Sequence, residues 1–94
     1  MLIRNRKAVN LAIRKHAQLR KPIAQWIDLT EGAVWQSIID AKATWPTADA
    51  IKGTRLTCFN IGGNNFRLIA MVSYDRQEIA IEEILTHAEY NKKY

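Results

Sequence analysis

His87, Arg67 and Tyr90 are the residues of this chain whose types and spacing could carry out acid–base chemistry. Histidine accepts or donates a proton near neutral pH, and His87 is one of two histidines in the chain. Tyr90 follows three residues later, so both side chains fall on the same side of a helical turn that begins near Thr86. Arg67 can bind a phosphate through two parallel hydrogen bonds.

These residue types are the parts needed to cleave RNA without a metal ion. A base removes the proton of a 2′-hydroxyl, and the oxygen attacks the adjacent phosphate. Positive groups stabilise the crowded phosphorane while an acid protonates the leaving oxygen. Four further cations are candidates for holding the flanking RNA backbone: Lys52, Arg55, Lys92 and Lys93.

Each of these residues also has a purely structural interpretation. A histidine near a strand end is commonly a surface or hydrogen-bonded residue, and Tyr90 can anchor a short C-terminal turn. Arg67 can pair with Glu82 or Glu83, and Asn60 can cap a turn. Residue types alone therefore do not separate catalysis from structure.

The segment FNIGGNNFRLIA decides how Arg67 is positioned. A phosphate-binding glycine loop normally opens a helix, but here a run of alternating apolar residues follows. Gly and Asn tolerate the positive φ that tight hairpin turns require. We therefore predict a hairpin turn at residues 62–65, with no phosphate loop.

Three strands are predicted, over residues 55–61, 66–74 and 78–85, because these segments have a period of two and are rich in β-branched and aromatic residues. The hairpin places Asn60 opposite Arg67 on one face. If the second loop also has an even length, this polar face extends to Ile84 and Thr86 and brings His87 to its end. Glu82 falls on the same face by this alternation. The other face is apolar and should be covered by helices: Phe59, Ile61, Phe66, Leu68, Val72, Tyr74, Ile79, Ile81 and Leu85.

The N-terminal half has helical periodicity after a short strand at residues 2–3. Asn5 is expected to cap a first helix, and Pro22 suits the first turn of a second helix that continues to Ala41. Gly32 lies inside this second helix and predicts a kink or a close contact. The segment WPTADAIKG then reads as a surface loop.

Length and composition limit the remaining choices. The chain has 94 residues, of which 48% are hydrophobic, and it is expected to form one domain over residues 1–94. A net charge of +5 suits a polyanionic partner such as nucleic acid. No segment has the apolar length of a membrane helix or of a signal peptide, so a cytoplasmic protein is expected. Cys58 cannot form an internal disulfide, no metal or other cofactor is expected, and His16 reads as a solvated or core-edge residue.

The string FNIGGNNFRLIA, followed about twenty residues later by THAEY, resembles the HigB family of toxins within the RelE-like group. The resemblance covers almost the whole chain. The MLI start, two helices, the WPTAD segment, the glycine hairpin and the THAEY end occur in the expected order.

This resemblance implies a RelE-like α+β fold with two N-terminal helices on one face of a small antiparallel sheet. Such toxins cut mRNA, commonly in the ribosome, and are neutralised by a HigA-type helix-turn-helix antitoxin through which the complex contacts operator DNA. The likeness implies phosphate stabilisation by Arg67, proton transfer by His87, and orientation or proton transfer by Tyr90. It also implies that Asn60 and Asn64 shape the site.

Four positions depart from the family pattern. Asn65 and Phe66 stand where relatives often carry Lys-Tyr, which removes one positive charge from the turn. Glu82 stands where relatives often have arginine, and it could repel RNA or accept a proton. Asn91 replaces a common aspartate.

Two other classes of function remain open at this point. A non-catalytic nucleic-acid-binding module would keep the basic surface and would not need His87 or Tyr90. A protein-interaction module would recruit a partner strand at an exposed sheet edge and would show no salt-sensitive binding to RNA.

Overall fold

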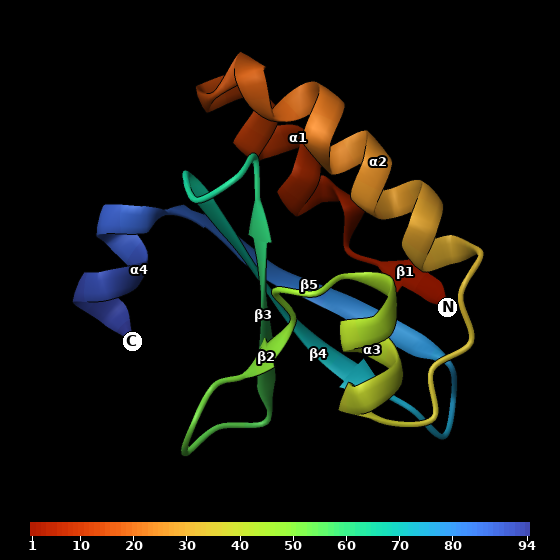
Figure 1. Ribbon diagram of the computed structural model, residues 1–94. Helices are drawn as coiled ribbons and strands as arrows, with labels where there is room; N and C mark the ends of the chain where they lie inside the picture. The colour runs from red at the N-terminus through yellow and green to blue at the C-terminus, as the bar shows by residue number, and fades with distance from the viewer.

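Five strands of the computed structural model, which describes residues 1–94, form one mixed sheet in the order β1-β5-β4-β3-β2 (Figure 1). The strands are β1 (Leu2–Arg4), β2 (Asp49–Ala50), β3 (Leu56–Ile61), β4 (Phe66–Ser73) and β5 (Glu78–Thr86). The α+β class and the three long strands are confirmed. An entirely antiparallel sheet is wrong, because β1 pairs with β5 in parallel. These two strands are separated by most of the chain, so local patterning carries no information on their pairing.

Four α-helices and one short 3₁₀ helix complete the fold. They are α1 (Arg6–Lys15), η1 (Ala17–Leu19), α2 (Arg20–Glu31), α3 (Ile38–Thr44) and α4 (His87–Lys93). No helix is both long and apolar enough to cross a membrane. The segment expected to be a plain surface loop after Trp45 also contains β2, which pairs with Thr57 and Cys58 of β3.

The expected continuous helix from Pro22 to Ala41 is wrong, because the chain forms two helices there. Gly32 caps the end of α2, and its N–H donates to the carbonyl of Asp28 at 3.3 Å. A new helix starts after Ser37, whose hydroxyl accepts a hydrogen bond from the N–H of Ile39. Apolar residues at helical spacing run through both helices, so periodicity alone does not reveal the break at Gly32.

Asn5 precedes α1 as expected, but its side chain does not cap the helix. Its backbone adopts φ 64°, which asparagine tolerates better than most residues. The side-chain amide instead donates to the carbonyl of Ile81 at 2.6 Å. Asn5 therefore ties the start of α1 to the middle of β5.

The larger hydrophobic core lies between the sheet and the N-terminal helices α1 and α2. Figure 1 shows α1 and α2 on the same side of the sheet. Val9 of α1 and Trp26 of α2 join Phe59 and Leu68 of the sheet in one buried cluster. Trp26 and Trp35 are 0% and 1% exposed. Their ring centroids lie 5.3 and 6.0 Å from that of Phe59, which makes both tryptophans core residues.

A smaller hydrophobic cluster lies on the opposite face of the sheet. Cys58 and Ile69 are buried there, and Tyr90 of α4 packs against them. Adjacent strand residues point to opposite faces, so Cys58 and Phe59 contribute to different clusters. The C-terminal helix α4 therefore packs at one end of the face opposite α1 and α2.

A β-bulge in β5 changes the expected distribution of residues between the two faces. Ile69 pairs with Glu83 whereas Ala70 pairs with Ile81, so Glu82 is the extra residue. The loops before β4 and before β5 each contain four residues, as the even-loop expectation required. The bulge nevertheless shifts the alternation by one position.

This shift corrects three assignments. Leu85, not Ile84 or Thr86, lies opposite Arg67, and Ile84 packs against the larger core. Glu82 does not lie on the face of Arg67, and it lines a cavity beside α1. Glu83 lies opposite Ile69 instead. Simple alternation cannot predict this, because a bulge carries no strong sequence signal of its own.

Candidate active site

The turn between β3 and β4 holds the site residues at one end of the sheet. Gly62 and Gly63 have φ values of +65° and +67°, which few other residues adopt, and the N–H of Asn65 closes the turn on the carbonyl of Gly62. A strand follows the turn, so the hairpin prediction is confirmed. The pairing of Asn60 with Arg67 is confirmed as well.

Arg67 is the centre of the site. Its side chain was expected on an open polar face, but the residue is only 7% exposed. Nη1 donates to the carbonyl oxygens of Asn64 and Phe66 at 3.1 and 3.2 Å. Nη2 donates to Oδ1 of Asn64 at 3.0 Å and contacts Nδ1 of His87 at 2.9 Å. The guanidinium is therefore held in one orientation by four hydrogen bonds.

His87 is the first residue of α4 and lies against the glycine turn. Its N–H donates to the carbonyl of Asn65 at 2.9 Å. A capping box fixes the helix start, because Oγ1 of Thr86 accepts from the N–H of Glu89 and the Glu89 carboxylate accepts from the N–H of Thr86. The hydrogen bond to Asn65 and the capping box thus set the position of the imidazole.

Nδ1 of His87 lies within hydrogen-bond distance of two groups. A guanidinium can only donate hydrogen bonds, so the 2.9 Å contact with Arg67 uses the lone pair of Nδ1. Nδ1 also lies 3.2 Å from the carbonyl oxygen of Asn64. That oxygen can accept a hydrogen bond from Nδ1–H only when the lone pair of Nδ1 is no longer used by Arg67.

Tyr90 lies beneath Arg67, one helical turn after His87. The Cζ atom of Arg67 is 5.7 Å from the centroid of the Tyr90 ring, which is cation–π distance. Burial raises the pKa of the Tyr90 hydroxyl above its usual value of 10.0, and the neighbouring thiol of Cys58 raises it further. The phenol is therefore protonated at neutral pH.

Asn64 contacts Arg67 directly, and Asn60 supports Asn64 from the other side. Nδ2 of Asn60 donates to Oδ1 of Asn64 at 3.3 Å, and the same oxygen accepts from Arg67. The backbone of Asn60 is also fixed, since its N–H donates to Oγ1 of Thr47 and its carbonyl accepts from Nε1 of Trp45. The two asparagines therefore connect Arg67 to the open edge of β3.

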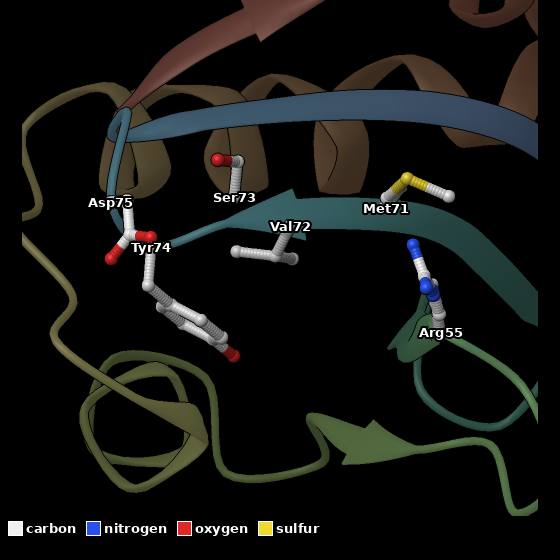
Figure 2. A pocket seen from close by; sticks show the side chains of 6 residues that line it. All are labelled: Arg55, Met71, Val72, Ser73, Tyr74 and Asp75. Atoms are coloured by element: carbon white, nitrogen blue, oxygen red, sulfur yellow. The ribbon is translucent and has the colours of Figure 1, made fainter.

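Lys52 and Arg55 do not join this site. Arg55 precedes β3 by one residue and is five positions from Asn60, or about 16 Å along an extended strand. Figure 2 shows its side chain beside Met71 and Val72, at the end of the sheet where β4 finishes. It lines a cavity of about 370 Å³ there, and exposed Lys52 lies in the loop that precedes it.

Lys92 and Lys93 lie in the last turn of α4, where both side chains are exposed. Lys93 is paired with Glu83 at 2.9 Å, and the Tyr94 hydroxyl donates to the same carboxylate at 2.9 Å. Burial and Glu83 raise the pKa of Tyr94 to about 12. Lys92, unlike Lys93, has no carboxylate within ion-pair distance.

Two side chains that border the site were not associated with it from the sequence. Cys58 is buried beside Tyr90, and burial raises the pKa of its thiol. His16 packs on the ring of Phe66 with 5.1 Å between centroids, at the back of the glycine turn. The alternation of side chains along β3 places Cys58 on the same face as Arg67, so its position could have been predicted from the sequence. No local pattern indicates the contact between His16 and Phe66.

No group of three or more His, Cys, Asp or Glu side chains is arranged to hold a metal ion. The cations and proton donors described above are thus the groups that the chain itself brings to this end of the sheet. Together they can bind an anionic group, hold a proton on an imidazole nitrogen and donate one from a phenol.

Comparison with known proteins gives consistent matches. Residues 19–93 match the family HigB_toxin, described as the RelE-like toxic component of a toxin-antitoxin system. The chain is 30% identical over 86 residues to the mRNA interferase toxin HigB of Escherichia coli K12, covering 90% of this chain and 83% of that protein. The same identity and coverage hold for proteins named mRNA interferase HigB from Escherichia coli O157:H7 and Shigella flexneri.

Proposed function

The chain belongs to the HigB family of RelE-like toxins from toxin-antitoxin systems, and from this we propose that it is an mRNA endoribonuclease that inhibits translation. The relatives named mRNA interferases support an RNA substrate. The observation that carries the proposal is the contact of one buried guanidinium with both a histidine and a tyrosine. Arg67 lies 2.9 Å from Nδ1 of His87 and 5.7 Å from the ring of Tyr90.

The first step is binding of the scissile phosphate by Arg67. A phosphate oxygen is a stronger acceptor than a neutral imidazole or a carbonyl, so it draws Nη2 away from His87. Asn64 keeps its two contacts with the guanidinium and limits how far it turns. Arg67 then stabilises the charge that develops on the phosphorane.

The second step is the removal of the 2′-hydroxyl proton by His87. Once Arg67 has moved to the phosphate, Nδ1 takes up a proton from solvent while Nε2 releases its own to solvent, and Nδ1–H donates a hydrogen bond to the carbonyl oxygen of Asn64, 3.2 Å away. The lone pair then lies on Nε2, where it accepts the proton from the attacking hydroxyl. Phosphate binding and base activation are thereby coupled through one arginine.

The third step is departure of the 5′-oxygen. Tyr90 is a protonated phenol whose pKa is raised by burial, and it donates to this oxygen or orients Arg67 toward it. The oxygen bound to phosphorus is replaced by the attacking 2′-oxygen, so the products are a 2′,3′-cyclic phosphate and a free 5′-hydroxyl. No metal ion and no other cofactor takes part in this sequence.

The cations outside the site have weaker roles. Lys92 is exposed in the last turn of α4 and can contact RNA there, and Lys93 becomes available if Glu83 releases it. Lys52 and Arg55 lie at the other end of the sheet and can contact only a distant part of a long RNA or ribosome surface. Asn60 and Asn64 serve as orienting residues for Arg67.

The partners follow from the same proposal. The mRNA is cut while it is bound in the ribosome, and the toxin is held inactive by a HigA-type helix-turn-helix antitoxin. Operator DNA is contacted only through the antitoxin. Membership in a toxin-antitoxin family supports an antitoxin partner and an mRNA substrate.

The test uses the purified chain with mRNA bound in bacterial ribosomes. We expect cuts whose ends are a 2′,3′-cyclic phosphate and a 5′-hydroxyl. A matched mRNA with a single 2′-deoxy nucleotide at the main cut site should resist cleavage at that site only. Cutting of the deoxy site would overturn the 2′-hydroxyl mechanism, and an intact mRNA would overturn the nuclease proposal.

A further inference from the structure

A second hollow adjoins the site at the open edge of β3. Its volume is about 400 Å³, within the range of about 300–1,000 Å³ that is typical of small-ligand pockets. Three parts of the chain line it: α2, the segment after α3, and the hairpin. The main contributors are Gln25, Leu29, Trp45, Pro46, Asn60 and Gly63.

The lining residues indicate what kind of group the hollow accepts. No charged side chain lines it, so it suits neither a phosphate nor a cation. Trp45, Leu29 and Pro46 supply apolar surface, and the amide groups of Gln25 and Asn60 can donate and accept hydrogen bonds. A planar neutral ring with polar edges fits this combination.

The tryptophan wall is fixed in place by β3. Nε1 of Trp45 donates to the carbonyl of Asn60 at 2.9 Å, and Oγ1 of Thr47 accepts from the N–H of Asn60 at 3.1 Å. These bonds satisfy the carbonyl and the N–H of Asn60, which lies beyond the part of β3 that pairs with β2. A ring held in this way can stack on a ligand without losing further side-chain entropy.

Asn60 connects this hollow to the phosphate site. Its backbone holds Trp45, while its side chain donates to Oδ1 of Asn64, which accepts from Arg67. Only two side-chain hydrogen bonds therefore separate the hollow from the guanidinium.

From this arrangement we propose that the hollow beside Trp45 is a nucleobase subsite, which stacks one unpaired base of the RNA whose phosphate lies on Arg67. The inference rests on the proposed ribonuclease function and adds the residue that grips the strand next to the cut. Leu29, which is 44% exposed, lines the same hollow and adds apolar surface for the base.

The test exploits the burial of the other two tryptophans. Trp26 and Trp35 are 0% and 1% exposed, whereas Trp45 is half-buried, so an added RNA can quench only Trp45 directly. The probe is a fluorescently labelled 2′-O-methyl RNA, which has no attacking hydroxyl and stays intact. We expect it to quench the indole emission of the wild-type chain.

Affinities of three variants complete the experiment. Base stacking on an aromatic residue is worth about 1–3 kcal/mol, so Trp45→Ala should weaken binding by about 5- to 150-fold. Trp45→Phe keeps a stacking ring and should recover most of this loss. Tyr74→Ala removes an aromatic ring from the hollow at the far end of the sheet and should bind like the wild type (Figure 2).

The outcomes separate this inference from the function on which it rests. Equal binding by Trp45→Ala and the wild type, or bound RNA without quenching, overturns the subsite and leaves the nuclease intact. Stacking on Trp45 without any cleavage of unmodified RNA in ribosomes supports the subsite and overturns the nuclease. A wild-type chain that neither binds nor cuts RNA overturns both. Thermal unfolding of each variant identifies any loss caused by misfolding.

Discussion

Nη2 of Arg67 lies 2.9 Å from Nδ1 of His87, although the two residues are 20 positions apart in the chain. The contact is possible because the β3–β4 hairpin and the start of α4 meet at one end of the sheet. It occupies the lone pair that a general base would need. In the proposed mechanism, His87 therefore becomes a base only when another acceptor takes the guanidinium, and a phosphate is such an acceptor.

Replacement of Arg67 by lysine tests the need for a guanidinium. Lysine keeps the positive charge but cannot reproduce two donors to Asn64 together with the contact to His87. We expect cleavage of mRNA to fall by about 100- to 1,000-fold, as for other groups that stabilise a developing charge. Rates are measured with mRNA bound in ribosomes.

The same substitution should also lower stability. Arg67 is buried and donates hydrogen bonds to the carbonyls of Asn64 and Phe66. Loss of these hydrogen bonds should lower the free energy of unfolding by about 1–3 kcal/mol. Urea unfolding measures this cost. Full activity in a folded Arg67→Lys variant would show that bidentate phosphate binding is not needed.

Replacement of Tyr90 by phenylalanine separates the ring from the hydroxyl. The ring should remain under Arg67, so we expect the fold to be kept while cleavage falls by about 100-fold or more through loss of the proton donor. A small effect on the rate would mean that Tyr90 only supports Arg67 by packing.

The pH dependence of Tyr90 has a defined sign. Burial raises its pKa above 10.0, so the folded state holds the phenolic proton more tightly than the unfolded chain. The stabilisation is therefore complete below pH 10.0 and is lost as the pH rises through the folded pKa. Titration of tyrosinate absorbance in the wild type and in Tyr90→Phe should show one late-ionising phenol fewer in the variant.

Replacement of Thr86 by alanine tests the capping box that positions His87. The variant loses the acceptor for the N–H of Glu89, which should cost about 1 kcal/mol and loosen the first turn of α4. We expect broader NMR signals from His87 and Tyr90 and a reduced cleavage rate. Unchanged spectra would show that the contact with Asn65 alone holds the helix start.

Acid should have a related effect on the wild type. Hydrogen bonds from the backbone and side chain of Thr86 hold the pKa of Glu89 below its usual value of 4.5. Because the folded pKa is lowered, the stabilisation is present above pH 4.5 and is lost as the pH falls through the folded value. The Glu89→Gln variant should lack this acid-dependent loosening of α4 in NMR spectra.

The sequence was sufficient to predict the hairpin and the pairing of Asn60 with Arg67. Two glycines and two asparagines between alternating apolar residues permit few other structures, and an even loop fixes which residues face each other. The place of His87 near this end was also predictable, since it follows the third strand directly.

The remaining features depend on tertiary contacts that no local pattern records. The bulge at Glu82 moves Leu85 to the face of Arg67, and Gly32 ends a helix whose apolar spacing continues beyond it. The parallel pairing of β1 requires a partner at the other end of the chain. The burial of Arg67 follows from the position of α4, which single-strand alternation cannot supply.

The most direct test of the account is to map mRNA 5′ ends in bacteria after induction of the wild-type chain or His87→Ala. A matched control is His16→Gln, because His16 packs on Phe66 outside the hydrogen bonds of Arg67. We predict new ends within translated frames for the wild type and the control, and none for His87→Ala at equal expression. Unchanged ends in His87→Ala, or no new ends from the wild type, would contradict the central claim.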